Sequence, residues 1–438
     1  MKDFEGSRAG FQRFIPATWR DAGYAGGGPI PSGLMRAILT FAVGLVLGMP
    51  ASPAHAETPV ASVRVAFDRN GTTGTQASGY ADVAARRAVG SDDPVRVASI
   101  SKLVTAIGAM RLVEEGKLDL DADLSPVLGW RLRNPAFPDA PITLRRLLSH
   151  RAGLTDAAGY YAIPLDGALR ETTDDPRAWD DAHAPGTFFR YANLNFAVVA
   201  SAMERATGER FDRLMQRLVF VPLKIDACFN WESCSDAKAA RAIVLYDAAG
   251  KPVRDDNGGR KPECAVNRST KGDCDLSQWK PGRNGALFSP QGGLRISAND
   301  LAKIGRLLLN DGEVDGVRLL KPASIREMEK PLWTFEPGNG LTVEEDDSSQ
   351  SQRGFYCRYG LAVQTLATRR EGCRDDPFGD GVQRVGHAGA AYGLLSGVWV
   401  DRASGTGVVY FATGVEDAPR GAASAFTEVE EQLARGAR

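Results

Sequence analysis

The stretch SISKLVTAIGAMRLVEEG, residues 99–116, decides the fold of this chain. Its apolar residues fall on nearly every face of a helix, and Gly116 is placed to end that helix. A helix that is apolar all round belongs in the core of a domain. We therefore expect a buried helix whose first turn carries two polar residues of chemical interest, Ser99 and Lys102.

Ser99 and Lys102 form a Ser-x-x-Lys pattern at the start of this helix. Residues three apart share a helix face, so the lysine amine can approach the serine oxygen. A serine hydroxyl is a poor nucleophile at neutral pH, but a lysine removed from water has a lowered pKa and can accept the hydroxyl proton. The first backbone N–H groups of the helix also favour negative charge near Ser99. The pair predicts a nucleophilic serine with a lysine as its proton acceptor.

The same spacing occurs at Ser235–Lys238 and at Ser277–Lys280, both in polar segments that contain cysteines. Only Ser99 opens a long apolar helix, and this context favours it as the nucleophile. The structural alternative is a helix-capping serine followed by a lysine whose amine extends to solvent.

Strand patterns lie on both sides of this helical region. Residues 63–89 alternate as two antiparallel strands with a turn at 70–71. Strand-like alternation returns at 359–367, 385–389, 393–400 and 407–413, and a helical pattern follows over 421–435. We therefore predict an α+β fold: an antiparallel sheet from about 57–92 and 355–415, flanked by helices, with a mainly helical domain inserted over about 97–330. Within that insertion, residues 143–150, 195–207 and 299–310 have helical patterns, and 226–286 is a polar insertion that contains cysteines.

The N-terminal region has the features of a secretory signal. Residues 35–56 contain one arginine, a short apolar run and a small-residue end at Ala54-His55-Ala56. We expect residues 35–56 to be removed, residues 1–34 to be a non-native extension, and residues 57–435 to form the domain that contains Ser99. The apolar run is short for a transmembrane span, so we expect a periplasmic or secreted protein without an integral membrane segment.

Charge and cysteines narrow the function class further. Basic residues (53) and acidic residues (54) nearly cancel, and no basic run is interleaved with aromatics, so we expect no nucleic-acid partner. The six cysteines fall in three pairs close in sequence, Cys228 with Cys234, Cys264 with Cys274 and Cys357 with Cys373. In an oxidising compartment they favour disulfides over metal, although fifteen pairings of six cysteines are open. We expect no metal and no cofactor.

Two further motifs accompany Ser99. Tyr191-Ala192-Asn193 precedes the helix predicted from residue 195, and Gly386-His387-Ala388-Gly389 falls on a strand near the C-terminus. With these motifs in this order, the sequence resembles the serine β-lactamase and penicillin-binding-protein superfamily, most closely the class C β-lactamase, D-aminopeptidase and related esterase branch. The resemblance runs from about Val63 to Arg435.

The resemblance implies a mechanism without a metal. Ser99 would be acylated, Lys102 and Tyr191 would exchange its proton, and water would release the acyl group. Asn193 would hold the amide carbonyl of a small-molecule or peptide-like substrate. The edge strand would line the substrate with His387, Ala388 and Gly389, and the backbone N–H groups of Ser99 and Ala390 would form the oxyanion hole.

His387 departs from the pattern of efficient β-lactamases. Those relatives usually carry lysine at this position, which attracts the substrate carboxylate, whereas a mostly neutral imidazole offers less charge. Lys280-Pro281-Gly282 is no substitute, because proline disrupts a strand. We therefore expect an esterase or a D-amino-acid peptidase rather than an efficient β-lactamase.

Other readings have less support. An α/β-hydrolase needs Gly-x-Ser-x-Gly, and no serine here has glycine two places before it. His150 and His183 have structural interpretations, the first at a helix C-terminus and the second in a loop. The alternative function is a penicillin-binding acyl trap or sensor-like protein with little turnover.

Overall fold

The computed structural model describes residues 58–344, 353–415 and 418–436. The expected N-terminal extension (1–34) and signal peptide (35–56) lie outside the described residues. In the described residues no helix is long and apolar enough to cross a membrane.

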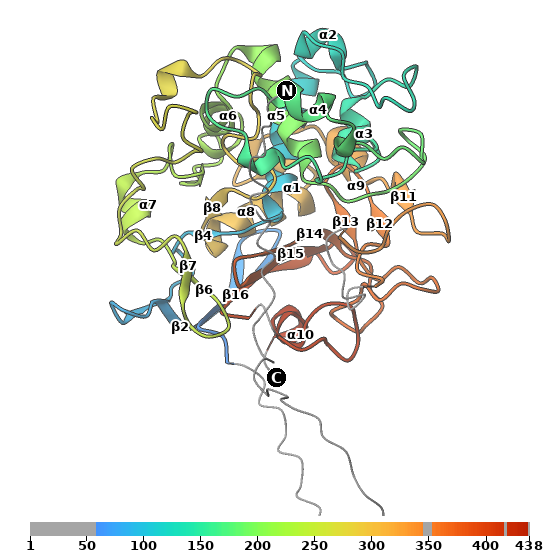
Figure 1. Cartoon of the computed structure of the whole chain (residues 1–438). Coiled ribbons are helices and arrows are strands. Elements are labelled where there is room, and N and C mark those ends of the chain that lie inside the picture. The colour runs from blue at the N-terminus through green and yellow to red at the C-terminus, as the bar shows by residue number, and fades with distance from the viewer. Residues whose placement is uncertain (1–57, 345–352, 416–417, 437–438) are drawn as a thin grey trace, which may run out of the picture. The chain divides into compact units, whose positions relative to one another are not determined.

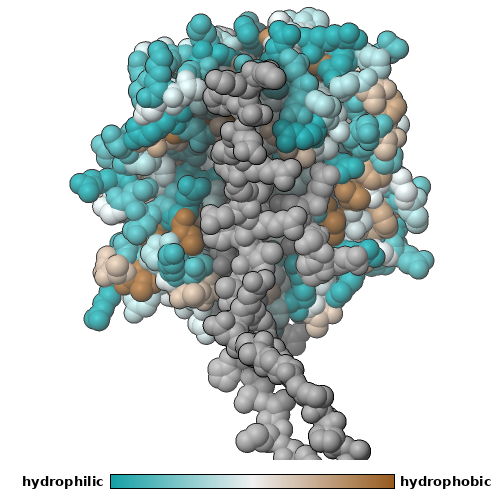
Figure 2. All heavy atoms as spheres, viewed as in Figure 1, coloured by the Kyte–Doolittle hydropathy of each residue, from teal (hydrophilic) through white to brown (hydrophobic). Residues whose placement is uncertain are grey.

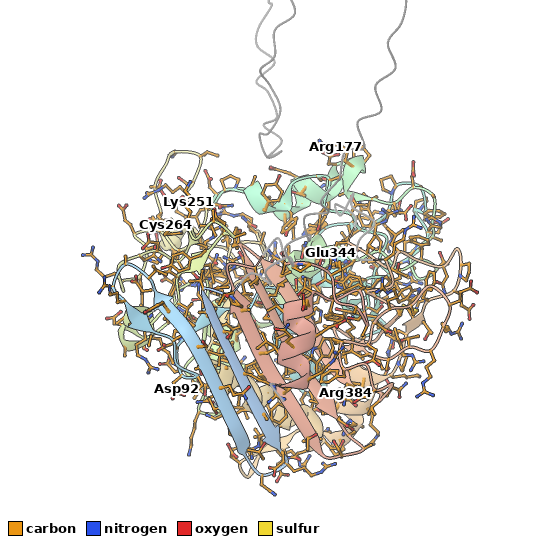
Figure 3. The ribbon with its side chains drawn as sticks, turned by 90° about the horizontal axis from the view of Figure 1, so that it is seen from below. Asp92, Arg177, Lys251, Cys264, Glu344 and Arg384 are labelled. Atoms are coloured by element: carbon orange, nitrogen blue, oxygen red, sulfur yellow. A yellow bond between two sulfur atoms is a disulfide. The ribbon has the colours of Figure 1, made fainter. Side chains whose placement is uncertain are left out.

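A nine-stranded sheet joins the two ends of the described chain. Its order is β11-β12-β13-β14-β15-β16-β1-β2-β3, and neighbouring strands are antiparallel. Figure 3 shows the blue N-terminal strands beside the red C-terminal strands. The strands are β1 (Ala61–Asp68), β2 (Thr72–Asp82), β3 (Arg87–Ala88), β11 (Trp333–Thr334), β12 (Arg358–Tyr359), β13 (Gln364–Thr365), β14 (Val385–Ala391), β15 (Leu394–Asp401) and β16 (Thr406–Thr413). This sheet confirms the predicted α+β class.

Helices cover both faces of the sheet. Because side chains alternate along a strand, Phe67 and Arg64 of β1 point to opposite faces. Phe67 packs on α8 (Ala298–Leu309), where a Cβ added to Gly305 would lie 2.4 Å from the phenyl ring. Arg64 donates from Nε to the Leu433 carbonyl of α10 (Glu428–Arg435), 2.8 Å away, on the other face. Figure 1 shows α8 above the sheet and α10 below it.

The middle of the chain builds the mainly helical part. Its helix α1 (Ile100–Glu114) is buried along almost its whole length, as the sequence predicts. The other helices there are α2 (Ser125–Leu128), α3 (Leu144–Leu148), α4 (Leu169–Asp174), α5 (Leu194–Thr207), α6 (Phe211–Met215), α7 (Asp236–Ala240) and α9 (Pro322–Glu329). Short strands accompany them: β4 (Val95–Arg96), β5 (Cys228–Phe229) and β8 (Leu294–Ile296) in one sheet, β6 (Leu245–Tyr246) with β7 (Pro252–Arg254), and β9 (Glu313–Val314) with β10 (Val317–Arg318).

Two predicted elements differ from the structure. The single strand expected over 359–367 is wrong, because the chain turns back after Tyr359 and pairs it with Gln364 of β13. Ala362 has a φ of 53° in that turn, a conformation that alternation of apolar residues does not reveal. The C-terminal helix begins at Glu428 rather than near 421, because Thr427 caps it by accepting from the Glu430 backbone.

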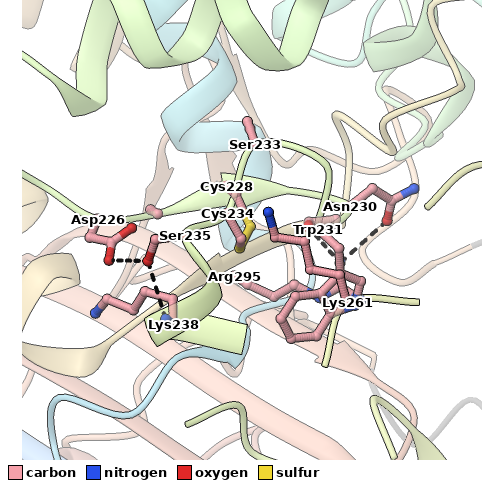
Figure 4. The surroundings of a disulfide bond; sticks show 12 residues. Asp226, Cys228, Asn230, Trp231, Ser233, Cys234, Ser235, Lys238, Lys261 and Arg295 are labelled. Atoms are coloured by element: carbon pink, nitrogen blue, oxygen red, sulfur yellow. Dashed lines mark hydrogen bonds between the residues drawn. A yellow bond between two sulfur atoms is a disulfide. The ribbon is translucent and has the colours of Figure 1, made fainter. Parts of the chain in front are cut away.

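Three disulfides join the cysteines that are close in sequence: Cys228–Cys234, Cys264–Cys274 and Cys357–Cys373. The first holds a turn that presents Trp231 beside Arg295 of β8 (Figure 4), whose guanidinium carbon lies 4.6 Å from the indole ring centroid. Two of the disulfides lie in the predicted insertion over 226–286. On the face shown in Figure 2, the described residues are mostly hydrophilic, with scattered hydrophobic ones.

Candidate active site

Ser99 lies at the start of α1, where the chain leaves an unusual turn. It is the N-cap residue of the helix, and Ala98 before it has a φ of 47°. A non-glycine residue in this conformation is uncommon and is retained where the surrounding structure enforces it. The turn leaves Ser99 half-buried and lining a cleft of about 400 Å³, while the rest of the helix enters the core.

Lys102 is buried directly beside Ser99. Its Nζ donates to the Ser99 Oγ at 2.9 Å, to the Asn193 Oδ1 at 2.8 Å and to the Gln291 carbonyl at 3.1 Å. Burial lowers the pKa of Lys102 to about 8, although the carboxylates of Glu344 and Asp156 oppose the shift. A substantial fraction of this lysine is therefore uncharged at slightly alkaline pH, and the free amine can accept a proton from the hydroxyl that it contacts.

Tyr191 completes the group around Lys102. The ammonium nitrogen lies 4.6 Å from the centroid of the Tyr191 ring. The phenol oxygen is buried and has no hydrogen bond within the described residues, although the side chains of Ser99 and Tyr356 are near enough to affect its pKa. Burial raises the pKa of Tyr191 well above its ordinary value. The phenol is therefore neutral at physiological pH, and of the two groups Lys102 is the better proton acceptor.

Asn193 is held by a carboxylate that the sequence analysis did not single out. Its Nδ2 donates to Asp156 Oδ2 at 2.9 Å while its Oδ1 accepts from Lys102. Asp156 also accepts hydrogen bonds from the backbone N–H groups of Asn193 and Leu194, at 2.9 and 2.8 Å. These N–H groups at the start of α5 have no partner within the helix. The carboxylate fixes which way the Asn193 amide faces. In the sequence, the one feature that indicates Asp156 is its acidic side chain two positions after Leu154, in the loop that follows α3.

Strand β14 brings its backbone against the start of α1. A Cβ on Gly389 would lie 2.4 Å from the Val97 carbonyl oxygen and 3.0 Å from the Ser99 nitrogen, so only glycine permits this approach. Residues 388–391 line the same cleft as Ser99. Within the described residues β13 pairs with β14 only at Val385 and Gly386, which leaves the outer edge beyond them unpaired. An extended substrate can bind along such an edge.

The position of His387 differs from the expectation that its side chain lines the substrate. Its side chain is 1% exposed and is not among the cleft-lining residues. The Nδ1 atom faces the Ala388 carbonyl, and Nε2 lies 2.8 Å from the Tyr359 hydroxyl. Burial, together with the charge of Lys102, lowers the pKa of His387 to about 3. The reason is strand alternation: His387 points to the side of β14 that Tyr359 covers.

His150 also contacts the site. Its ring stacks on Tyr191 with 4.2 Å between centroids, and its Nδ1 accepts from the Ala192 backbone N–H at 3.1 Å. The other face of Tyr191 stacks on Tyr356, at 4.6 Å. Two rings therefore fix the plane of the phenol. His183 pairs with Asp180 instead and stacks on Phe188.

The structure thus brings Ser99, Lys102, Tyr191 and Asn193 together, with residues 388–390 beside them and the His387 ring behind the strand. In the described ranges no group of three or more histidine, cysteine, aspartate or glutamate residues could hold a metal ion.

Comparisons with known proteins identify the family and the fold. A sequence model of the family described as Beta-lactamase matches residues 52–431. Among solved structures, the octameric penicillin-binding protein homologue from Pyrococcus abyssi has a TM-score of 0.60 at 19% identity, over 86% of this chain and 72% of that one. This likeness concerns the fold alone.

Two curated relatives are enzymes by name. The chain is 30% identical over 208 residues to Esterase EstB from Burkholderia gladioli, a match that covers 43% of this chain and 50% of the esterase. It is 32% identical over 168 residues to D-aminopeptidase from Brucella canis, covering 36% of this chain and 30% of the peptidase. The chain spans about half the length of the first curated relatives that it matches.

Proposed function

The chain belongs to the Beta-lactamase family, and from that premise we propose that it is a serine hydrolase that works through an acyl-enzyme on Ser99. One observation carries the proposal. The Nζ atom of a buried lysine lies 2.9 Å from the Ser99 Oγ, and burial lowers the pKa of this lysine to about 8. A hydroxyl with a base of this kind at hydrogen-bond distance is equipped for nucleophilic attack.

The proposed reaction has two steps. The free amine of Lys102 takes the Oγ proton as Ser99 attacks the substrate carbonyl carbon, and the backbone N–H groups of Ser99 and Ala390 stabilise the oxyanion. The bond to the leaving group then breaks, and the Tyr191 hydroxyl donates its proton to that group. The protonated Lys102 returns a proton to the Tyr191 oxygen. A water molecule attacks the ester of Ser99 in the same manner, which releases the acid and restores the serine.

The proposed substrates are esters or D-amino-acid amides and peptides rather than β-lactams. The His387 side chain is buried behind the strand, and burial lowers its pKa, so the imidazole is uncharged. This strand position therefore supplies no cation for a β-lactam carboxylate. The similarity to an esterase and to a D-aminopeptidase supports the same choice.

We also propose that the mature enzyme comprises residues 57–435 and acts in the periplasm or outside the cell. The signal-like residues 35–56 support export. Three disulfides support an oxidising compartment.

The test is a substrate panel with a quantitative readout. Purified protein is mixed with short-chain nitrophenyl esters, D-amino-acid amides, a D-Ala-D-Ala peptide, a cephalosporin and a fluorescent penicillin. The proposal predicts turnover of an ester or amide and slow or absent cephalosporin hydrolysis. A stable penicillin adduct without turnover of any compound would instead identify an acyl trap, and no reaction with any of them would contradict both functions.

A further inference from the structure

A second hollow, of about 740 Å³, adjoins the cleft of Ser99, and Tyr392 lines both. Tyr392 is at the tip of the β14–β15 hairpin with a φ of 55°, an unusual conformation for a bulky residue. The insertion over 226–286 packs against this tip: a Cβ on Gly393 would lie 1.9 Å from the Tyr246 carbonyl oxygen. Most residues that line the hollow belong to the insertion, and Tyr392 at the hairpin tip lies between the hollow and the cleft of Ser99.

Two arginines meet at the Tyr392 ring. Arg254 of β7 donates to the Tyr392 hydroxyl at 2.6 Å, and its guanidinium carbon lies 4.3 Å from the ring centroid. The guanidinium carbon of Arg96, from β4, lies 5.0 Å from the same centroid. The Nε atom of Arg96 donates to the Gly292 carbonyl, at 2.8 Å. Both arginines line the hollow.

A buried carboxylate that lines the hollow, Asp255, is already ion-paired. Asp255 forms a bidentate ion pair with Arg295, with N···O distances of 2.7 and 3.1 Å. It also accepts a hydrogen bond from the Trp231 indole N–H. Figure 4 shows Trp231 and Arg295 side by side next to the Cys228–Cys234 disulfide. Asp256, which is exposed, also lines the hollow. Within the described residues neither Arg96 nor Arg254 forms an ion pair.

We propose that Arg96 and Arg254, gathered around Tyr392, form a subsite for a carboxylate carried by the substrate. This inference rests on the proposed hydrolase function, because it assigns the hollow to the part of the substrate that extends from Ser99 past Tyr392. Guanidinium groups match carboxylates in shape and charge, and such charge-assisted hydrogen bonds are stronger than neutral ones. The enzyme then prefers anionic esters or amides to neutral ones of the same shape.

The test compares matched ester pairs. In one pair, 3-carboxyphenyl acetate and 3-carbamoylphenyl acetate, the charge is on the alcohol part. In the other, the mono-4-nitrophenyl ester of adipic acid and the corresponding ester of its monoamide, the charge is on the acyl part. We expect kcat/KM for the anionic ester to exceed that of its amide twin by about tenfold in one of the pairs. The preference should decrease when salt is raised from about 0.05 M to about 0.5 M.

Arg254 is the residue to change, because it is exposed and its loss leaves the core intact. Arg254→Gln should remove most of the preference through a higher KM for the anionic ester, and Arg254→Lys should retain part of it. Arg260→Gln is the matched control: Arg260 is exposed in the same insertion and is not among the residues that line the hollow. Equal hydrolysis of both members of both pairs, or a preference that survives Arg254→Gln, would overturn the subsite.

A binding measurement separates this inference from the proposed function. Calorimetric titration of the Ser99→Ala protein with 3-carboxyphenyl acetate, its amide twin and the two adipate esters needs no turnover. The subsite is supported if an anionic ester binds more tightly than its amide twin and Arg254→Gln abolishes this difference. This holds even if the wild-type protein hydrolyses nothing. Equal binding within both pairs contradicts the subsite while leaving Ser99-dependent hydrolysis of neutral esters as a separate result.

Discussion

The Nε2 atom of His387 lies 2.8 Å from the hydroxyl oxygen of Tyr359, inside the protein rather than in the cleft. Because the Nδ1 atom faces the Ala388 carbonyl and donates to it, Nε2 accepts from the tyrosine. The imidazole has both nitrogens satisfied in its neutral form, and its pKa of about 3 keeps it neutral in any physiological medium.

His387→Lys therefore should not create a carboxylate-binding cleft. The new ammonium would replace a 1%-exposed side chain and lie near the charge of Lys102, so we expect the free energy of unfolding to fall by about 3 kcal/mol. Denaturant titration measures this change. His183→Lys is the control, because His183 lies partly exposed beside Asp180. A stable His387→Lys protein with higher kcat/KM for cephalosporins would show that this side chain reaches the substrate.

The pH dependence of the reaction should follow Lys102. Below about pH 8 the amine is increasingly protonated and cannot accept the Ser99 proton, so kcat/KM for a neutral ester should rise about tenfold per pH unit and level off above pH 8. The sign follows from the lowered pKa, because the active form is the deprotonated one. Steady-state rates between about pH 6 and pH 10 provide the profile. A rate that falls as pH rises through 8 would exclude this role for Lys102.

Tyr191→Phe should separate catalysis from stability. Its hydroxyl has no hydrogen bond within the described residues, so the Tm should change little, whereas kcat should fall on the order of 100-fold if the phenol transfers protons. Tyr80→Phe, at a residue 47% exposed on β2, is the control. Loss of Tm with unchanged kcat would give Tyr191 a packing role only.

Asp156→Ala should affect both stability and activity. It removes the acceptor of the Asn193 and Leu194 backbone N–H groups, for which we expect a loss of about 1–2 kcal/mol in the free energy of unfolding. It also releases the Asn193 amide, so kcat/KM should fall by about tenfold. Asp181→Ala changes an exposed aspartate and should leave both quantities unchanged. An Asp156→Ala protein with full activity would mean that Asn193 needs no such support.

The sequence predicts those parts of the molecule that depend on local periodicity. The apolar helix after Ser99 and the alternating strands at the two ends suffice for the α+β class, because each signal lies within one element. The proximity of Ser99 and Lys102 follows from helix geometry in the same way. The three disulfides join cysteines close in sequence, but the count of six left their pairing open.

Features that depend on tertiary contact could not be predicted. No motif marks Asp156, whose importance comes from packing against the start of α5. The direction of the His387 ring depends on which face of β14 the other strands cover. Arg254 lies in the polar insertion and Arg96 on a strand 158 residues earlier, and both contact the Tyr392 ring. The sequence shows only that the insertion is polar and contains cysteines, so this contact could not be predicted.

The most direct test of the account is the site of acylation. The protein is mixed with 4-nitrophenyl acetate, quenched in acid and digested, and the acetylated peptide is identified by mass spectrometry. We expect an acetyl group on Ser99 and the loss of both this group and turnover in Ser99→Ala. Ser277→Ala, which changes an exposed serine with the same spacing to a lysine, should leave both unchanged. Acetylation at another residue, or full turnover by Ser99→Ala, would contradict the account.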